Sequence, residues 1–429
     1  MVHELFFVII KGGNVYMKKM TNWEELQWRG LVKDVAGDDI ADKINGEPIT
    51  FYWGTDPTAD SLHLGHYSSL VTAMRLMKMG HHPILLCGGA TGRIGDPRPT
   101  AEREIISIET LNKNIEGIRN QIDTLFGGKA KLVNNYDWFK GYEFLDFLRD
   151  VGKYINVNYM LSKDIIDRRL ETGITYAEFS YMLIQGYDFL HMYRDMNCIM
   201  QVEGSDQWGN ITTGIDLIRK IEGKEAYAFT MPLILDSTGK KFGKSEGNAL
   251  WLDKTKTSSY ELYQYLLNTE DSMVEHYLKV FTFLTPEEIM DVVEQHNKEP
   301  HLRIGQKKLA ECIITDIHGK EDYDKAVSIS NALFGGDLTG LTADEILIGM
   351  KMVPSINISG EIKLIDLLVD NGICTSRREA REMLAANAIS INNERYTDEN
   401  AVIDKSIAID GKVLVIRKGK KKQSIVSSE

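Results

Sequence analysis

The sequence predicts an α/β protein in which a doubly wound parallel sheet is followed by an all-α region and a small α+β region. Up to about residue 250, short apolar runs, glycine-rich or polar loops and amphipathic segments alternate. After Trp251 the periodicity is helical, with few strand signals. From Ile362, two short helical patterns are followed by β-branched runs. Strand–loop–helix alternation is typical of parallel sheets, whose ligands bind at the carboxyl ends of the strands.

The elements of the sheet region follow from local patterns. PITFYWG over 48–54 carries aromatic and β-branched residues into a glycine, which indicates a strand. The cap-rich TDPTADS then precedes a helix over 63–79. HPILLCG over 82–88 is a continuous apolar run, typical of a strand buried on both faces. After the glycine-rich GGATGRIGDP we expect a helix near 108–126, a strand near 130–134, a helix over 176–193, a strand over 197–202 and a helix from SDQWGN through Ile221.

Four further helices are predicted, over 258–267, 271–284, 287–295 and 303–317. Thr285 and Pro286, followed by two glutamates, are a typical helix start. The apolar LFFVII near the amino terminus is too short for a secretion signal. It indicates either a dispensable extension before a body that begins near Met20 or an extra edge strand. We therefore predict an extension over 1–19 that can be disordered, an α/β domain over 20–250, a helical domain over 251–341, a linker over 342–361 and a small domain over 362–429.

Composition and charge exclude several classes of protein. The 429 residues are 43% hydrophobic and 26% charged, as in ordinary soluble globular proteins, and no run approaches the ~18 apolar residues of a membrane span. The net charge of −12 argues against DNA or other nucleic acid bound by the whole surface. Residues 362–422 nevertheless hold 12 basic and 9 acidic side chains, which suits a nucleic-acid partner held at one end.

The cysteines give no sign of a metal or disulfide framework. Cys87, Cys198, Cys312 and Cys374 are far apart and form no C-x-x-C pair. We expect each of them to be a small buried apolar residue. A reducing, cytoplasmic setting fits this usage best.

Two short motifs point to phosphate chemistry. His63-Leu64-Gly65-His66 lies at a predicted helix start, where backbone N–H groups and the positive helix end favour an anion. The two histidines share one helix face, and Gly65 lets a nucleotide approach the backbone closely. In the later loop KKFGKS, Lys241 and Lys244 can reach one polyphosphate. The plainer interpretations are capping or surface histidines and a solvated basic turn.

Taken together and in this order, five segments resemble bacterial tyrosyl-tRNA synthetases of the class I family: YWGTDPTADSLHLGH, GGATGRIGDP, FSYMLIQGYDFL, GSDQWGN and KFGKS. The resemblance runs from about Trp23 to the final lysines. It implies a Rossmann-like catalytic domain, a helical anticodon-recognition domain and an S4-like RNA-binding domain. The basic tail Arg417–Lys422 would add phosphate contacts to tRNA(Tyr), although a solvated, disordered terminus is an equal alternative for its last residues.

The resemblance also implies a binding site for L-tyrosine. Its members would be Tyr52 and Asp188 at the phenol, Asp96, Tyr181 and Gln185 at the α-ammonium, and Gln201 and Gln207 near the reacting carboxylate. The spacing of Tyr181, Gln185 and Asp188 agrees with this, because it places three polar groups on one face of a helix among apolar neighbours. If buried, they need partners, which a phenol and an ammonium group supply. The alternative is an exposed polar stripe.

For ATP, the resemblance implies a second set of residues. Gly204 and Asp206 would meet the ribose, Asp56 would lie near the adenylate, and Thr58 would contact the γ-phosphate side. His63 and His66 would bind phosphate in the transition state, and Lys241 and Lys244 would close over pyrophosphate. The remaining members of the nucleotide set are Gly54, Gly65, Phe242, Gly243 and Ser245.

The chain departs from the family pattern at several positions. Trp53 and Glu203 stand where small residues are usual near the nucleotide, and Leu64 replaces isoleucine. The basic segment RPTAER is shortened, so no individual role is assigned to Arg98 or Arg103.

The reaction implied by the resemblance has two steps. The tyrosine carboxylate attacks the α-phosphorus of ATP, and the tyrosyl group then passes to the terminal ribose of tRNA. The carboxylate is already a nucleophile, so catalysis depends on positioning and charge stabilisation. Mg²⁺ would accompany ATP on its phosphates and waters, with no tightly bound protein metal. If phenylalanine entered, Asp188 and Tyr52 would lose their partner.

Other interpretations stay open at this stage. The family is homodimeric, and the aromatic segment 136–160 suits either an interface or ordinary core. A tryptophanyl-type synthetase would share the fold and phosphate motifs, although Asp188 with Tyr52 favours a phenol. A non-catalytic RNA-binding paralogue would have lost those motifs, and other H-x-G-H nucleotidyltransferases are usually much shorter.

Overall fold

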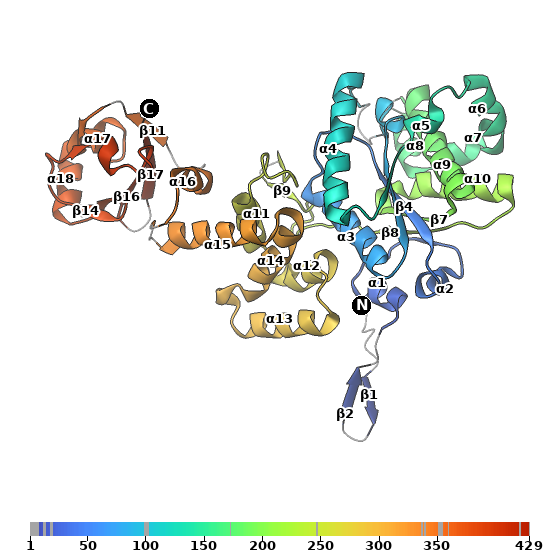
Figure 1. Cartoon of the computed structure of the whole chain (residues 1–429), viewed down its shortest axis with the longest axis horizontal. Coiled ribbons are helices and arrows are strands. Elements are labelled where there is room, and N and C mark those ends of the chain that lie inside the picture. The colour runs from blue at the N-terminus through green and yellow to red at the C-terminus, as the bar shows by residue number, and fades with distance from the viewer. Residues whose placement is uncertain are drawn as a thin grey trace. The chain divides into compact units, whose positions relative to one another are not determined.

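In the computed structural model, the chain divides into two compact units (Figure 1). Unit 1 comprises Met1–Thr257 and Thr269–Ile313, and unit 2 comprises Ser258–Asn268 and Ile314–Glu429. The structure describes residues 8–11, 14–17, 20–97, 103–171, 173–245, 248–335, 338, 340–350, 355–358, 360–419 and 422–428. The predicted helical region thus contributes to both units, and the five-segment domain division stays a prediction.

A six-stranded sheet forms the centre of unit 1, with the strand order β3-β8-β7-β4-β5-β6. Its strands are β3 (Val35–Ala36), β4 (Thr50–Thr55), β5 (His82–Cys87), β6 (Lys131–Asn134), β7 (Cys198–Gly204) and β8 (Tyr227–Met231). All neighbours are parallel except β3 with β8. From β4 the chain moves outward to β5 and β6, and it then returns to β7 on the other side of β4. At such a reversal the connections diverge and leave a crevice at the carboxyl ends of β4 and β7. The predicted doubly wound parallel sheet is confirmed.

Long helices connect these strands: α3 (Leu64–Lys78), α4 (Ile108–Phe126), α9 (Tyr176–Met196) and α10 (Trp208–Glu222). The bounds of α4 match the prediction, but α9 runs three residues further than expected. It ends where Asn197 adopts a left-handed conformation, with φ of 53°. α9 and α10 approach each other closely at Gly214, where an added Cβ would lie only 3.0 Å from the side chain of Phe189. The glycine therefore leaves room for α9 to pack against α10.

Shorter elements complete unit 1. They are β1 (Val8–Lys11), β2 (Asn14–Met17), α1 (Asn22–Trp28), α2 (Ile40–Asn45), η1 (Thr91–Arg93), α5 (Tyr136–Phe139), α6 (Phe144–Asp150), η2 (Gly152–Tyr154), α7 (Val157–Leu161), α8 (Asp164–Leu170), η3 (Ser205–Gln207), β9 (Lys244–Ser245), β10 (Asn248–Ala249), η4 (Asp271–Met273), α12 (Val274–Phe281), α13 (Pro286–Lys298) and η5 (Pro300–Leu302). β1 pairs with β2 rather than with the six-stranded sheet. Thr285 caps α13 as predicted.

Unit 2 combines helices with a small mixed sheet. Its elements are α11 (Ser259–Leu267), the end of α14 (Ile304–His318), α15 (Lys320–Gly335), α16 (Ala343–Gly349), β11 (Ser355–Ile358), β12 (Ile362–Lys363), α17 (Leu364–Asp370), α18 (Arg377–Ala385), β13 (Ile389–Ile391), β14 (Glu394–Tyr396), β15 (Val402–Ile403), η6 (Lys405–Ile407), β16 (Val413–Lys418) and β17 (Lys422–Ser428). The predicted linker contains α16 and β11, and β11 pairs in parallel with β17. The basic tail lies partly in β16 and β17, which pair with each other.

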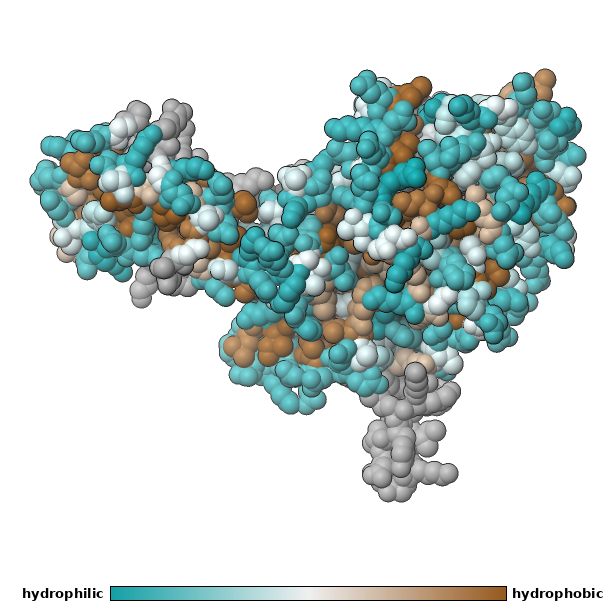
Figure 2. Space-filling view, in the orientation of Figure 1, coloured by the Kyte–Doolittle hydropathy of each residue, from teal (hydrophilic) through white to brown (hydrophobic). Residues whose placement is uncertain are grey.

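Apolar side chains form a separate core in unit 2 around α17, α18 and the sheet. On the face seen in Figure 2, hydrophilic residues predominate, with smaller hydrophobic areas among them. Within the described residues, no helix is long and apolar enough to cross a membrane.

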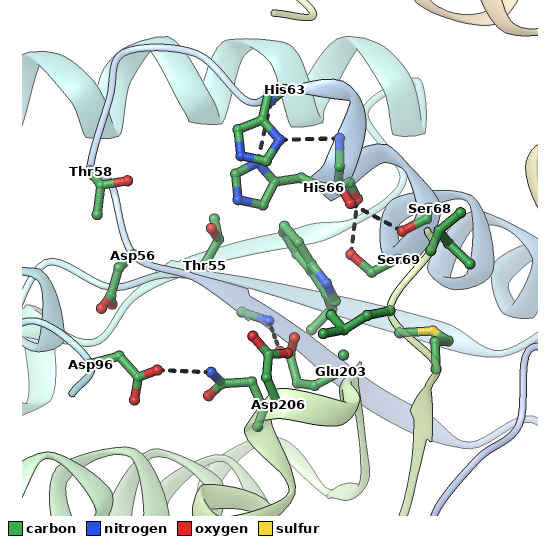
Figure 3. A pocket seen from close by; sticks show the side chains of 18 of the residues that line it. Thr55, Asp56, Thr58, His63, His66, Ser68, Ser69, Asp96, Glu203 and Asp206 are labelled. Atoms are coloured by element: carbon green, nitrogen blue, oxygen red, sulfur yellow. Dashed lines mark hydrogen bonds between the residues drawn. The ribbon is translucent and has the colours of Figure 1, made fainter. Parts of the chain in front are cut away.

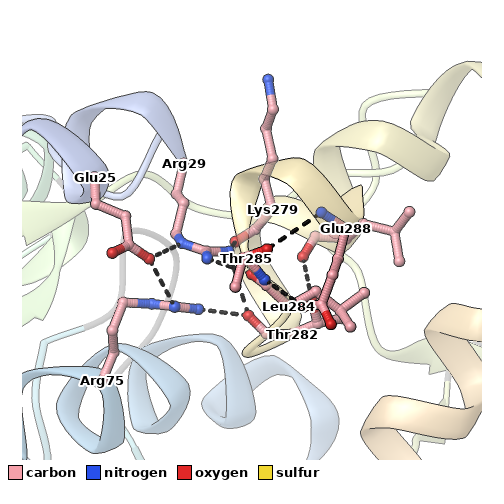
Figure 4. A network of polar contacts seen from close by, with 9 residues as sticks. Glu25, Arg29, Arg75, Lys279, Thr282, Leu284, Thr285 and Glu288 are labelled. Atoms are coloured by element: carbon pink, nitrogen blue, oxygen red, sulfur yellow. Dashed lines mark hydrogen bonds and ion pairs between the residues drawn. The ribbon is translucent and has the colours of Figure 1, made fainter. Parts of the chain in front are cut away.

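A buried charged network joins α1, α3 and α12 (Figure 4). Glu25 accepts from Arg29 at 2.7 Å and from Arg75 at 3.3 Å. The two guanidinium groups also donate to the carbonyl oxygens of Lys279, Thr282 and Leu284, at and beyond the end of α12. Positive charge is favourable there, because the carbonyl groups of a helix end have no partner within the helix. The network therefore fixes α12 against the helix that begins at His63.

Replacing Glu25 by glutamine tests this network. The guanidinium groups of Arg29 and Arg75, which are 1% and 5% exposed, would then lose the carboxylate that pairs with both of them. Breaking a buried ion pair costs ~3–5 kcal/mol, and since Glu25 is partly exposed we expect a loss of about 1–3 kcal/mol in the free energy of unfolding. Urea denaturation measures it, with Glu294→Gln, in the exposed pair with Lys298, as the control. Equal stability of the two variants would show that the network contributes nothing.

Candidate active site

A cavity of about 460 Å³ opens at the carboxyl ends of β4 and β7, where the sheet topology places a crevice (Figure 3). Thr55 is the last residue of β4 and Asp56 follows it, and Gly204 is the last residue of β7, with Asp206 two residues beyond. The start of α3 and the middle of α9 close its other sides. Residues from distant parts of the chain therefore meet in one cavity.

The two histidines of the H-x-G-H motif begin α3. His63 is the N-cap residue, and its Nδ1 accepts from the backbone N–H of Gly65 at 3.1 Å. Nδ1 of His66 accepts from the backbone N–H of His63 at 3.3 Å, and the two rings stack with centroids 3.8 Å apart. With both Nδ1 atoms accepting, the neutral rings carry their hydrogens on Nε2. Burial and the neighbouring His63 lower the pKa of His66 to about 3, so His66 is a neutral hydrogen-bond donor at pH 7.

The KFGKS loop lies directly against this helix start. A Cβ on Gly243, whose φ is +83°, would lie 2.8 Å from the backbone nitrogen of Gly65, so only glycine allows this approach. Phe242 is buried, with its ring centroid 4.5 Å from that of Tyr277 and 4.7 Å from that of Phe281. Because Phe242 is fixed in this way, the preceding residue Lys241 is held at the cavity, which His63 and His66 also line. The side chains of Lys244 and Ser245 lie outside the described residues.

At another wall of the cavity, Asp188 lies buried beside Tyr52. Its two carboxylate oxygens accept from Nδ2 of Asn135 at 3.0 Å and from Nε1 of Trp138 at 2.9 Å. Burial nevertheless raises the pKa of Asp188 to about 8. The Tyr52 hydroxyl is buried and has no hydrogen-bond partner within the described part of the chain. This wall can thus recognise a hydroxyl group that both donates and accepts.

Next to this wall lies a second group of carboxyls, which are partly buried. The hydroxyl of Tyr181 donates to Asp56 at 2.9 Å, and the side-chain amides of Gln207 and Asn210 each donate to Asp96 at 3.1 Å. Burial, reinforced by the charge of Asp56, raises the pKa of Asp96 to about 6. A bound cation would relieve this clustering of acidic groups, so the cavity suits an ammonium group.

Two glutamine side chains have unsatisfied atoms in the same region. Oε1 of Gln185, on α9, and Nε2 of Gln201, on β7, are buried without a partner among the residues described. Buried polar atoms normally find hydrogen-bond partners, so the atom of Gln185, which lines the cavity, marks a place where a ligand can bind, whereas Gln201 is not among the lining residues.

The two unusual residues of the sequence also belong to the cavity. Trp53 is 2% exposed, and its Nε1–H has no acceptor among the described residues. Glu203 is 6% exposed and accepts from the backbone N–H of Gly54. Burial raises the pKa of Glu203 well above its usual value.

Most of the residues predicted for the site line this one cavity. They are Tyr52, Gly54, Asp56, Thr58, His63, Gly65, His66, Asp96, Tyr181, Gln185, Asp188, Gly204, Asp206, Gln207, Lys241, Phe242 and Gly243. Gln201 lies on β7, where it pairs with Tyr52 across the sheet. Arg98 lies outside the described residues, whereas Arg103 lines the cavity and donates through Nε to the carbonyl oxygen of Asp96 at 2.9 Å.

The sequence interpretation missed three residues that hold the buried carboxylates, namely Asn135, Trp138 and Asn210. Asn135 and Trp138 follow the end of β6, so the rule that ligands meet carboxyl ends of parallel strands could have found them. Asn210 is the last residue of the segment GSDQWGN, one of the five that carry the resemblance.

Comparison with known proteins places the chain in a family. The family model of tRNA synthetases class I (W and Y) matches residues 44–335, and that of the tyrosine--tRNA ligase SYY-like C-terminal domain matches residues 345–426. The tyrosine--tRNA ligase of Staphylococcus haemolyticus is 48% identical, over 94% of this chain and 98% of its own. That of Bacillus pumilus is 47% identical, with the same coverage. A C-terminally truncated mitochondrial tyrosyl-tRNA synthetase of Aspergillus nidulans is 32% identical with a TM-score of 0.66, covering 73% of this chain and 94% of its own.

The role of Trp138 in holding Asp188 can be tested by titration. Trp138→Phe keeps the ring that stacks on His191 but loses the N–H that stabilises the charged carboxylate. The pKa of Asp188 should therefore rise above about 8. Infrared difference spectroscopy of the protonated carboxyl band measures it, with Asp188→Asn to identify the band. An unchanged midpoint would show that this hydrogen bond does not stabilise the carboxylate.

Proposed function

Because the chain belongs to the class I tRNA synthetases for tryptophan and tyrosine, and among them to the tyrosine--tRNA ligases, we propose that its cavity is where L-tyrosine and ATP react. The observation that carries this proposal is the arrangement of one cavity. An unpartnered tyrosine hydroxyl and a buried carboxyl occupy one part of it, and a helix start with two histidines occupies another. The products of the first step are tyrosyl-adenylate and pyrophosphate.

The phenol of the substrate binds between Asp188 and Tyr52. Asn135 and Trp138 fix the orientation of the Asp188 carboxyl, which then meets the substrate hydroxyl without rearranging. Phenylalanine would leave both buried polar groups without a partner, which is the more costly situation. An indole offers no hydroxyl to this pair, which favours tyrosine over tryptophan.

The α-ammonium group binds among Asp96, Tyr181 and Gln185. The clustered carboxyls of Asp56 and Asp96 favour a cation there, and the unpartnered Oε1 of Gln185 accepts one of its hydrogens. Gln201 and Gln207 then lie near the substrate carboxylate. The substrate carboxylate is already a nucleophile, so the reaction needs no general base. The site has only to position this carboxylate against the α-phosphorus.

The phosphates of ATP lie at the start of α3. Mg²⁺ accompanies ATP as part of the substrate. His63 and His66 donate through Nε2, and the backbone N–H groups of the helix start add a favourable field. Lys241 and Lys244 neutralise the charge that passes to pyrophosphate. Thr58 meets the γ-phosphate side, while Gly204 and Asp206 meet the ribose.

The second step delivers the tyrosyl group to tRNA(Tyr). We place tRNA contacts on the helices of 251–341 and on the S4-like domain with its basic strands β16 and β17. The apolar side chains of Phe144, Leu145 and Val157 are exposed on the segment 136–160, which suits either an interface or ordinary core, and their exposure supports a homodimer. We also propose a cytoplasmic setting.

The experiment that tests the function is exchange of pyrophosphate into ATP with each amino acid in turn. We expect exchange with tyrosine and none with tryptophan or phenylalanine, because only tyrosine satisfies Asp188 and Tyr52. A protein that binds tRNA but exchanges no pyrophosphate would be a non-catalytic paralogue. Exchange with tryptophan alone would move the assignment to the sister enzyme.

Truncation separates the two steps. Every residue that lines the cavity belongs to unit 1, so a chain ending at Gly360 should form adenylate at a rate close to that of the full chain. Charging of tRNA should fall by at least roughly tenfold, because basic phosphate contacts are lost. Pyrophosphate exchange and tRNA aminoacylation measure the two steps. Equal loss of both would mean that the removed part is needed for folding.

A further inference from the structure

We propose that Trp251 is a positioning residue, which holds the imidazole of His63 and the KFGKS loop in fixed places beside one another. The inference rests on the proposed function, in which His63 donates to the phosphates of ATP. Trp251 lies outside the five segments that carry the family resemblance, and it is not among the residues that line the cavity. It therefore acts on the reaction through His63.

The backbone of Trp251 pairs with the start of α3. Trp251 and His63 form an isolated antiparallel bridge. The carbonyl oxygen of the preceding residue, Leu250, accepts from the N–H of Leu64, the first residue of α3, at 2.7 Å. A helix start leaves such an N–H group without a partner inside the helix, and here Leu250 supplies the partner. The first turn of α3 is thus fixed to the segment that carries Trp251.

The same segment also holds the KFGKS loop. The N–H of Leu250 donates to the carbonyl oxygen of Gly243 at 3.0 Å. Leu250 is therefore bonded to one phosphate motif through its N–H and to the other through its carbonyl oxygen. The buried Thr257 accepts from the backbone N–H of Trp251 through Oγ1 at 2.9 Å, which fixes the segment in turn. A shift of this segment would move both motifs together.

The side chain of Trp251 contacts the imidazole of His63 itself. The two ring centroids lie 6.1 Å apart and the ring planes are inclined by 61°, an edge-to-face arrangement that aromatic rings prefer. His66 stacks on the same imidazole (Figure 3). Nδ1 of His63 accepts from the N–H of Gly65, which leaves Nε2 as the donor. Two rings and one hydrogen bond together therefore set the direction in which His63 donates.

An ion-pair network supports the indole. Nζ of Lys256 lies 5.3 Å from the ring centroid of Trp251, within the range of a cation–π interaction. Lys256 also pairs with Asp60, which lies in the loop between β4 and α3. Nζ of Lys113, on α4, lies 3.7 Å from the same carboxylate. The indole is thereby linked to the loop that leads to His63.

A fixed imidazole affects the rate of the reaction more than the affinity for the amino acid. A donor stabilises developing charge best when it already points to the place where that charge appears. An imidazole that turns among several rotamers points there for only part of the time. Tyrosine is proposed to bind at another wall of the cavity, so its affinity does not depend on Trp251.

Tyrosine-dependent pyrophosphate exchange by the full chain tests this role, with rates expressed per chain that forms adenylate in the first turnover. Trp251→Ala should lower kcat by roughly tenfold, since misplacing a group by ~1 Å can cost ~10²-fold, and should leave KM for tyrosine unchanged. Trp251→Phe keeps an aromatic ring and should keep most of the rate. Trp23→Ala is the matched control, because Trp23 makes a similar edge-to-face contact with Phe229 and does not line the cavity. It should exchange like the wild-type protein.

A double-mutant cycle shows whether Trp251 acts through His63. His63→Ala alone should lower kcat by about a hundredfold, and adding Trp251→Ala should then cause little further loss. A further tenfold loss in the His63→Ala background would overturn the proposal, because Trp251 would then act by another route. Equal kcat of Trp251→Ala and the wild-type protein would overturn it too. If Trp251→Ala does not fold, Trp251→Leu takes its place in the cycle with the same expected results.

The same measurements keep this inference apart from the proposed function. A wild-type chain without tyrosine-dependent exchange would overturn both. A wild-type chain that exchanges, together with an unchanged kcat in Trp251→Ala or Trp251→Leu, would overturn the role of Trp251 alone and leave the proposed function standing.

Discussion

The clustering of buried and partly buried carboxyl groups at one edge of a parallel sheet is the constraint on which the rest of the site depends. Asp56, Asp96, Asp188 and Glu203 all line one cavity, and burial raises the pKa of each. Neutral donors, rather than a matching set of cations, hold three of them: Tyr181 for Asp56, two amides for Asp96, and an amide and an indole for Asp188. Such donors fix the geometry without cancelling the charge. The cavity therefore favours a ligand with a cationic group and hydroxyl groups.

The helix α3 links this acidic region to the phosphate chemistry. Its first turn carries the two histidines, and the loop of Phe242 and Gly243 packs directly against that turn. Its last turn carries Arg75, which donates to the carbonyl of Thr282 beyond α12. α12 in turn supplies the rings on which Phe242 lies. One helix therefore fixes both the imidazole donors and the platform of the loop that brings Lys241 to the cavity.

The polar groups around Asp188 differ in burial from the hydrogen-bond donors at the start of α3, and this difference has a chemical meaning. At the wall proposed for the amino acid, the side chains of Tyr52 and Asp188 are buried, which suits recognition by hydrogen bonds whose absence is costly. In the region proposed for the phosphates, the donors are two partly buried histidines, an exposed lysine and backbone N–H groups at a helix start, which suits charge that moves during a reaction. On the proposed function, one cavity thus separates selection of the amino acid from stabilisation of the breaking triphosphate.

The sequence by itself predicted the parallel sheet, the bounds of several long helices and, through the family resemblance, many of the residues that line the cavity. It could do so because strand and helix periodicity, caps such as Thr285 and motifs such as H-x-G-H are local, so neighbours in the chain decide them. Only the tertiary structure decided which groups hold one another. Asn135 and Trp138 reach Asp188 from 53 and 50 residues away, and Glu203 meets Gly54 across 149 residues. Those contacts, and the unpartnered atoms of Tyr52 and Trp53, depend on which strands lie side by side, and no local pattern encodes that adjacency.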